Sequence, residues 1–326
     1  MNSRTAAFEF IRFSTNTIRL NTSVREGETK IGQVIENDEL SSAHRFLILG
    51  ISEDIGPQAN NGLPGASTGF QAFLKRFLNI QSNEFLTGES IYIAGEIIAN
   101  YDFQDSDEGR LKIVELDEFV ENVLKKYLDK QPDLIPVIIG GGHNNAYPLI
   151  KTLSEKKQNA LNVVNLDPHA DYRPLEGRHS GNAFSYAKED GFLNNYAVIG
   201  LHQSYNSQYI LDQLKKNHYW YSFFEEYISG KKTFENDLKE VLSYVNDRIY
   251  GIELDIDAIK DMPSSAMTPS GFTVEEARKY IQRMSTSSNV SYLHLPEAAP
   301  KTERDMVLVG KTLGYLVADF IKTIQK

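Results

Sequence analysis

The sequence contains no cysteine, and a surplus of positive charge is also missing. Without cysteine the chain cannot form disulfides, thiolate zinc sites or iron–sulfur clusters, and it cannot use a cysteine nucleophile. Any metal must therefore be held by oxygen and imidazole. The 34 Lys and Arg residues face 44 Asp and Glu, which gives a formal net charge of −10. Nucleic acids and anionic membrane surfaces bind clustered basic residues, so we expect neither as a partner.

Long hydrophobic runs are absent as well. No window approaches the ~18 consecutive apolar residues of a membrane span, and the N-terminus lacks the apolar stretch of a signal peptide. We therefore expect a cytoplasmic protein. The chain has 326 residues and shows no internal repeat, low-complexity tract or linker. We expect a single domain over residues 1–326, with a polar N-terminal extension over residues 1–45.

Short β-branched segments, each followed by Gly or Asp, alternate with helical patterns. Near-continuous apolar strands alternating with helices are typical of a parallel sheet that is covered on both faces. We therefore predict an α/β fold with three layers, α/β/α, and a mostly parallel sheet of about eight strands. The predicted strands are Phe46 to Gly50, Ile91 to Ala94, Pro136 to Ile139, Leu161 to Leu166, Tyr196 to Gly200, Ile249 to Leu254 and Val290 to Leu295.

Two helices are indicated most clearly. Residues 113–130 carry apolar residues at spacings of four or five, and the last helix begins after a capping Thr302. The charged segment 215–227 is predicted to be a solvated helix edge. The apolar stripe of the first helix is Val114, Phe119, Val123 and Tyr127; that of the last is Val309, Leu313, Leu316, Phe320 and Ile324.

Three predicted strands run into residues that can bind a metal. The segment NLDPHAD places Asp167, His169 and Asp171 at alternate positions, which in extended backbone point to the same side. The segment ELDID places Asp255 and Asp257 at the same spacing. The third strand runs into three glycines, which permit a tight turn with positive φ, and then into His143.

These six side chains would lie beyond the carboxyl ends of parallel strands, where open α/β sheets place their active sites. Four unpaired carboxylates in a partly buried cleft would be very costly, and two divalent cations would cancel their charge. Oxygen-rich ligation with two imidazoles and no sulfur favours Mn²⁺ over Zn²⁺. We therefore predict two Mn²⁺ ions per chain. For any one of these motifs alone, a polar strand exit is the alternative interpretation.

Over most of its length the chain resembles the arginase/agmatinase/formimidoylglutamase group of ureohydrolases. That family carries a Gly-Gly-x-His, an Asp-x-His-x-Asp and an Asp-x-Asp segment in this order, matched here by GGGHNN, DPHAD and ELDID. The resemblance implies an arginase-like fold. It also implies that His143 and Asp171 serve one Mn²⁺, that His169 and Asp257 serve the other, and that Asp167 and Asp255 bridge the pair.

The resemblance also suggests how catalysis would proceed. Two metals lower the pKa of a shared water towards ~7, and the natural electrophile is an amidine or guanidine carbon. Asp171 would hold the nucleophile and pass its proton to the departing nitrogen. Glu297, in the segment EAAP that resembles the family's late Glu loop, would pair with the cationic amidinium. An exposed loop carboxylate is the alternative interpretation for Glu297.

The substrate is indicated by departures from arginase. Arg173 lies two residues after Asp171, so in extended backbone it would point to the same side as the ligands. Its guanidinium suits a substrate carboxylate. A surface ion pair with Glu176 is the alternative interpretation. Phe184 stands where arginases carry a proton-shuttling His. Where arginine-specific members show an Asp, this chain has a tyrosine and an asparagine. The predicted substrate-binding residues are Arg173, Ser180, Asn182, Tyr205 and Asn206.

We therefore expect an enzyme that hydrolyses N-formimidoyl-L-glutamate to L-glutamate and formamide, in histidine breakdown. Its partner would be a small-molecule substrate, and a homo-oligomer is left open. The alternatives are an arginase- or guanidino-acid-type ureohydrolase that releases urea, and a non-catalytic relative. A zinc deacetylase on a related fold would need an adjacent His pair, which the sequence lacks.

Overall fold

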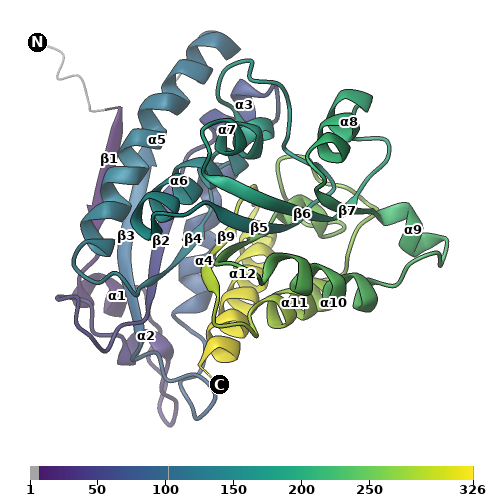
Figure 1. Cartoon of the computed structure of the whole chain (residues 1–326). Helices are drawn as coiled ribbons and strands as arrows, with labels where there is room; N and C mark the ends of the chain where they lie inside the picture. Colours follow the sequence, from purple (N-terminus) through teal and green to yellow (C-terminus); the bar gives the residue numbers. More distant parts are fainter. Residues whose placement is uncertain (1–6, 102, 326) are drawn as a thin grey trace, which may run out of the picture.

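The computed structural model describes residues 7–101 and 103–325, which form a sheet between two layers of helices (Figure 1). The sheet has nine strands among the described residues, in the order β1-β3-β2-β4-β9-β8-β5-β6-β7. All pairings are parallel except that of β1 with β3, so the predicted fold class is confirmed. The strands are β1 Phe8–Arg12, β2 Phe46–Ser52, β3 Ile91–Ala99, β4 Ile135–Ile139, β5 Leu161–Leu166, β6 Leu193–Leu201, β7 Trp220–Phe223, β8 Tyr250–Leu254 and β9 Val290–Leu295.

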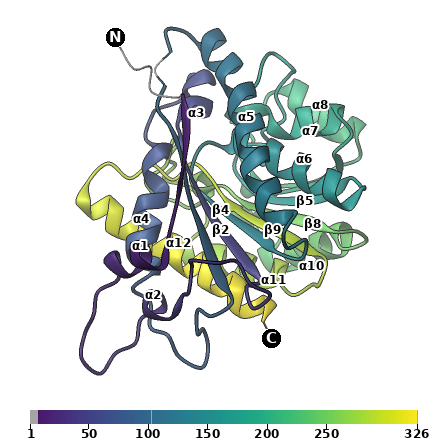
Figure 2. The same cartoon turned by 90° about the vertical axis from the view of Figure 1, so that its left-hand side faces the viewer.

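The helices divide between the two faces of the sheet. One layer contains α5, α6 and α7, and the other contains α4, α10, α11 and α12 (Figures 1 and 2). The helices are α1 Thr15–Leu20, α2 Ile31–Val34, α3 Ile55–Ala59, α4 Gly69–Phe77, α5 Ser106–Leu128, α6 Ala146–Lys157, α7 Ala183–Glu189, α8 Gln208–Lys216, α9 Phe224–Ile228, α10 Phe234–Val245, α11 Val274–Met284 and α12 Glu303–Ile324.

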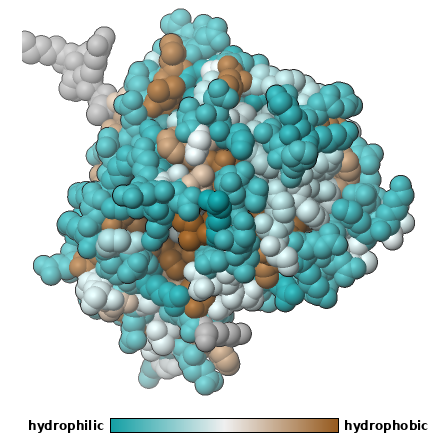
Figure 3. Space-filling model, in the orientation of Figure 1, coloured by the Kyte–Doolittle hydropathy of each residue, from teal (hydrophilic) through white to brown (hydrophobic). Residues whose placement is uncertain are grey.

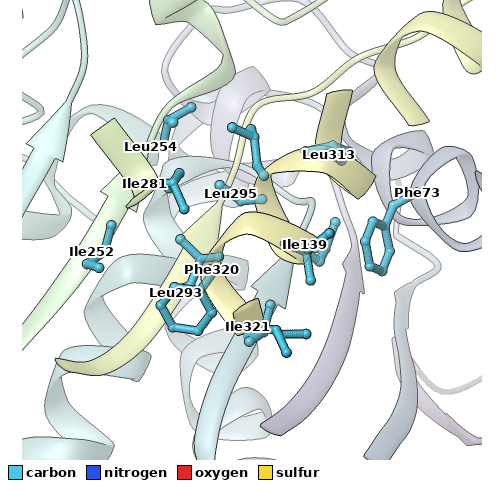
Figure 4. Packing of buried hydrophobic residues seen from close by; sticks show 14 of the residues in the cluster. Phe73, Ile139, Ile252, Leu254, Ile281, Leu293, Leu295, Leu313, Phe320 and Ile321 are labelled. Atoms are coloured by element: carbon cyan, nitrogen blue, oxygen red, sulfur yellow. The ribbon is translucent and has the colours of Figure 1, made fainter. Parts of the chain in front are cut away.

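The C-terminal helix α12 packs on the sheet as its apolar stripe predicts. Thr302 caps the helix, because its side chain accepts a hydrogen bond from the Asp305 backbone N–H at 3.2 Å. Leu313 and Phe320 are fully buried and lie against side chains of β4, β8 and β9 (Figure 4). Burial of a side chain of this size stabilises the fold by about 1.5–3 kcal/mol.

Three expectations about local structure need correction or extension. In α5 the predicted stripe is confirmed at Val123 and Tyr127, which are buried. It is wrong at Val114, which is 45% exposed, because the first turns of the helix bury Ile113 and Leu116 instead. The segment 215–227 is not a helix edge throughout, because it contains β7, an edge strand rich in aromatic residues. Within residues 1–45, β1 pairs with β3 and extends the sheet.

The surface agrees with the low mean hydropathy of the chain. Hydrophilic residues cover most of the face in Figure 3, and apolar residues gather in hollows between them. In the part of the chain that the structure describes, no helix combines the length and the apolar character that crossing a membrane requires.

Candidate metal centre

The predicted ligands meet at one edge of the sheet because four neighbouring strands end there. In the sheet order β4-β9-β8-β5, His143 follows β4, Asp255 follows β8 and Asp167 follows β5. Glu297 follows β9, the strand between β4 and β8. The carboxyl ends of parallel strands lie at the same edge, so residues far apart in the sequence converge.

Unusual backbone conformations aim these side chains. Gly140 and Gly141 have φ values of 86° and 70°, which confirms the tight turn predicted ahead of His143. Asp171 and Glu297 also have positive φ, 45° and 69°. Asp171 was predicted to point into the site because it lies at an alternate position of extended backbone, and that reason is wrong. Its backbone is left-handed, and this conformation turns the carboxylate inward.

His143 lies at the centre of one group of ligands. Its Nδ1 is 2.9 Å from Asp171 Oδ2, 2.9 Å from Asp255 Oδ2 and 3.3 Å from Asp167 Oδ2. The imidazole is fully buried, as are Asp167 and Asp255 to within a few per cent. One nitrogen and three carboxylate oxygens thus surround a common point.

His169 lies at the centre of a second, looser group. Its Nδ1 is 3.6 Å from Asp167 Oδ1 and 3.9 Å from Asp257 Oδ2. Asp167 therefore presents one carboxylate oxygen to each histidine, as the bridging role predicted for it would require. All six predicted ligands are brought together.

The charges of the cluster fit a pair of divalent ions. Burial, followed by repulsion from Asp257 and Asp167, raises the pKa of Asp255 well above its usual range. Burial also raises the pKa of Asp171 and of Asp257. Four carboxylates and two imidazoles without sulfur form a donor set for Mn²⁺, and cations between them would remove the cost of burying this charge.

A cavity of about 420 Å³ opens above the cluster. Glu297 lines the cavity and is only 3% exposed, so the alternative of an exposed loop carboxylate is wrong. Its Oε1 accepts a hydrogen bond from the His143 backbone N–H at 2.7 Å, whereas its Oε2 has no hydrogen-bond partner among the described residues. Burial, followed by repulsion from Asp257, raises the pKa of Glu297 to about 8.

Four of the five predicted substrate-binding residues line this cavity, namely Arg173, Ser180, Tyr205 and Asn206. Tyr205 stacks on the His169 ring with centroids 5.2 Å apart, and Ser180 accepts a hydrogen bond from Asn60 Nδ2 at 3.3 Å. Arg173 also lines the cavity, and its Nε donates to Glu176 Oε1 at 3.1 Å, so the surface ion pair considered above is present. The Arg173 side chain is 47% exposed and is therefore open to a ligand.

The side-chain amides of Asn182 and Asn206 form hydrogen bonds within the protein. Asn206 Oδ1 accepts from the Ala170 N–H at 3.0 Å, and its Nδ2 donates to the Pro168 carbonyl oxygen. Asn182 is fully buried, and its Oδ1 accepts from Arg178 Nη1 at 3.0 Å. Both residues hold the loops that carry the cavity walls, although Asn206 also contributes to the lining.

Asn60, near the centre, was not singled out from the sequence, whereas Phe184 was. Asn60 lines the cavity, and its Nδ2 donates to Ser180 Oγ at 3.3 Å. Its position in the polar loop after β2 was the only sequence signal. Phe184 is fully buried against the His143 and Tyr196 rings, and it is not among the described residues that line the cavity.

Solved structures with the same fold include two related enzymes. The formimidoylglutamase from Bacillus subtilis superposes with a TM-score of 0.76 at 18% identity, covering 93% of this chain and 94% of that chain. The formiminoglutamase from Trypanosoma cruzi, solved with Mn²⁺, superposes with a TM-score of 0.72 at 21% identity, covering 90% of this chain and 98% of that chain. These similarities show the fold.

Sequence comparison agrees with the fold. A formimidoylglutamase from Streptococcus gordonii is 24% identical over 299 residues, which cover 85% of this chain and 86% of that protein. One from Staphylococcus aureus is 26% identical over 278 residues, which cover 84% and 85% of the two chains. The model of the arginase family matches residues 44–317. The chain therefore belongs to the arginase family.

Proposed function

We propose that this protein is a binuclear manganese hydrolase that cleaves N-formimidoyl-L-glutamate into L-glutamate and formamide. The observation that carries the proposal is the convergence of two imidazoles and four carboxylates beneath a cavity whose rim holds an arginine. The names of the similar proteins, formimidoylglutamases from three bacterial species among them, support the same substrate.

We assign His143, Asp167, Asp171 and Asp255 to one Mn²⁺. The other would be held by His169 and Asp257 together with the same bridging carboxylates, Asp167 and Asp255. When bound, the two ions supply a water molecule whose pKa is lowered towards ~7. The short distances from Asp167 to both His143 and His169, and from Asp255 to His143, support this assignment.

Asp171 and Glu297 would act on the reacting groups. One oxygen of Asp171 faces His143 at 2.9 Å, which leaves the other oxygen to take the proton and return it to the departing nitrogen. Glu297 Oε2 is buried without a partner among the described residues, so an amidinium N–H would satisfy it. A cationic amidinium beside Glu297 would also favour the ionised carboxylate despite its raised pKa.

Arg173 would bind a carboxylate of the glutamate part, in a cavity that Ser180 and Tyr205 also line. Asn182 and Asn206 would support the cavity walls, in accordance with their hydrogen bonds. Three expectations from the sequence stay predictions: a single catalytic domain, a cytoplasmic location and a place in histidine breakdown. The sequence leaves a homo-oligomer open.

The test is a product assay on the full chain, stripped with a chelator and then reconstituted with Mn²⁺. Formamide and glutamate should appear in equal amounts from N-formimidoyl-L-glutamate, and no urea should be released from arginine or guanidino acids. Urea as the main product would favour the ureohydrolase alternative. A chain that binds no Mn²⁺ and gains no thermal stability from it would favour a non-catalytic relative.

A further inference from the structure

A buried carboxylate lies directly behind the metal cluster and is not explained by the proposed chemistry. Glu253, on β8, has no exposed surface and is not among the described residues that line the cavity. Its two oxygens each accept a hydrogen bond from β9. Tyr292 Oη donates to Oε1 at 2.7 Å, and His294 Nδ1 lies 2.7 Å from Oε2.

The same carboxylate faces the far nitrogen of a metal-site histidine. His143 Nδ1 points to Asp171 and Asp255, while His143 Nε2 lies 3.4 Å from Glu253 Oε2. Within the described parts of the chain, this buried Nε2 has no hydrogen-bond partner. If Nδ1 uses its lone pair for an ion, Nε2 must carry the proton, and a buried N–H without an acceptor costs about 1–3 kcal/mol.

Tyr292 and His294 determine which atom can accept a hydrogen bond from His143 Nε2–H. Tyr292 and His294 hold the Glu253 carboxylate from the neighbouring strand, so its oxygens are fixed before any ion binds. A shift of a few tenths of an ångström would bring His143 Nε2 within the usual hydrogen-bond distance of Oε2. Carboxylates that hold a ligating imidazole in this way fix its tautomer and increase its basicity.

We propose that Glu253 is a positioning residue that orients His143 and keeps its Nδ1 unprotonated for metal binding, with Tyr292 and His294 holding Glu253 in place. The inference rests on the proposed manganese function. His143, Glu253 and His294 could instead hold a cation themselves, since their ligand atoms lie within 4.8 Å of one another. The hydrogen bonds already made to both Glu253 oxygens favour the positioning role.

Glu253→Gln tests this role, because it preserves the volume of the side chain and removes its charge. Glu96→Gln is the matched control: Glu96 is likewise a buried carboxylate on a strand of the sheet, and it is hydrogen-bonded to Ser52 and Gln71. Mn²⁺ affinity is measured by calorimetric titration of the stripped full chain, and bound metal is counted. The KM for N-formimidoyl-L-glutamate is measured at saturating Mn²⁺.

In Glu253→Gln we expect one of the two ions to bind about 10- to 100-fold more weakly, as is typical when such a partner is lost. KM should stay within about twofold of the wild type, because Glu253 does not touch the cavity. Glu96→Gln should bind both ions normally. Tyr292→Phe removes one donor without changing the charge, and it should weaken the same ion to a smaller extent; it decides the question if Glu253→Gln does not fold.

Unchanged Mn²⁺ affinity in the folded variants would overturn the positioning role while leaving the proposed function intact. A third Mn²⁺ per wild-type chain that disappears in Glu253→Gln would overturn it by showing that the cluster is itself an ion site. A wild-type chain that binds no Mn²⁺ would instead refute the proposed function, and this inference with it.

Discussion

The role of Arg173 can be tested by substitutions that separate substrate recognition from metal binding. Arg173→Ala removes a guanidinium that lines the cavity, and Arg173→Lys keeps the charge but loses the planar fork. A hydrogen bond to a charged group contributes about 1.5–3 kcal/mol. The Arg173 side chain is 47% exposed and shares its charge with Glu176, so solvent screening places the effect at the lower end of this range.

A loss of about 1.5–2 kcal/mol corresponds to a decrease of about 10- to 30-fold in kcat/KM for N-formimidoyl-L-glutamate, with Arg173→Lys intermediate. Glu176→Gln should act in the opposite direction. It removes the carboxylate that competes for Arg173, so kcat/KM should rise by up to about fivefold. Arg25→Ala, at an exposed arginine outside the cavity lining, should leave kcat/KM unchanged.

The decisive comparison uses a second amidine substrate that lacks the carboxylates. Rates are measured by formamide release at saturating Mn²⁺, with metal content determined for each preparation. Arg173→Ala should leave this second substrate nearly unaffected, because no bound carboxylate loses its partner. Equal losses for both substrates, or reduced Mn²⁺ content in the variant, would refute the assignment of Arg173 to substrate recognition.

Three further results are expected. Asp167→Asn should abolish turnover and lower Mn²⁺ occupancy, because Asp167 presents one oxygen to each half of the cluster; normal activity would exclude this centre. Arg178→Ala should lower the free energy of unfolding, measured with urea, by about 3–5 kcal/mol, because it leaves the Asp117 carboxylate buried without its 3.0 Å partner. Burial lowers the pKa of His179 to about 4, and its Nδ1 accepts from the Gly181 N–H, so the folded state excludes a proton that the unfolded state binds. The stability contributed by His179 should be complete above about pH 6.5 and be lost as the pH falls towards 4, and His179→Gln should flatten this decline in urea titrations; an equally steep decline in the variant would contradict it.

The ligands could be predicted from the sequence because their signals are local. Each follows a short apolar strand directly, and the topology of a parallel sheet then brings strand ends together without further information. The strands Leu161–Leu166 and Val290–Leu295 were predicted with the bounds that the structure has. In these segments, chain pattern and tertiary structure favour the same conformation.

The remaining features depend on contacts between distant segments. Pairing of Phe8–Arg12 with β3 depends on an edge more than eighty residues away, for which the strand itself carries little signal. The burial of Glu297 follows from the His143 backbone, 154 residues earlier in the chain. Asn182 and Asn206 look like ligand-binding amides in sequence, because nothing local shows that backbone and side-chain groups of neighbouring loops already occupy them.

The strand order also constrains when the protein can fold during synthesis. The strands β1 to β4 form one half of the sheet and β5 to β8 the other, and among the described strands the two halves are hydrogen-bonded to each other only through β9. His143 belongs to the first half, and Asp167 and Asp255 belong to the second. On the ribosome each half can collapse early. The pairing of β9 with β4 and β8 joins the two halves, and it cannot form until residues 290–295 have been synthesised. A growing chain therefore carries two exposed sheet edges, one at β4 and one at β8, until residues 290–295 have been synthesised and can pair with both.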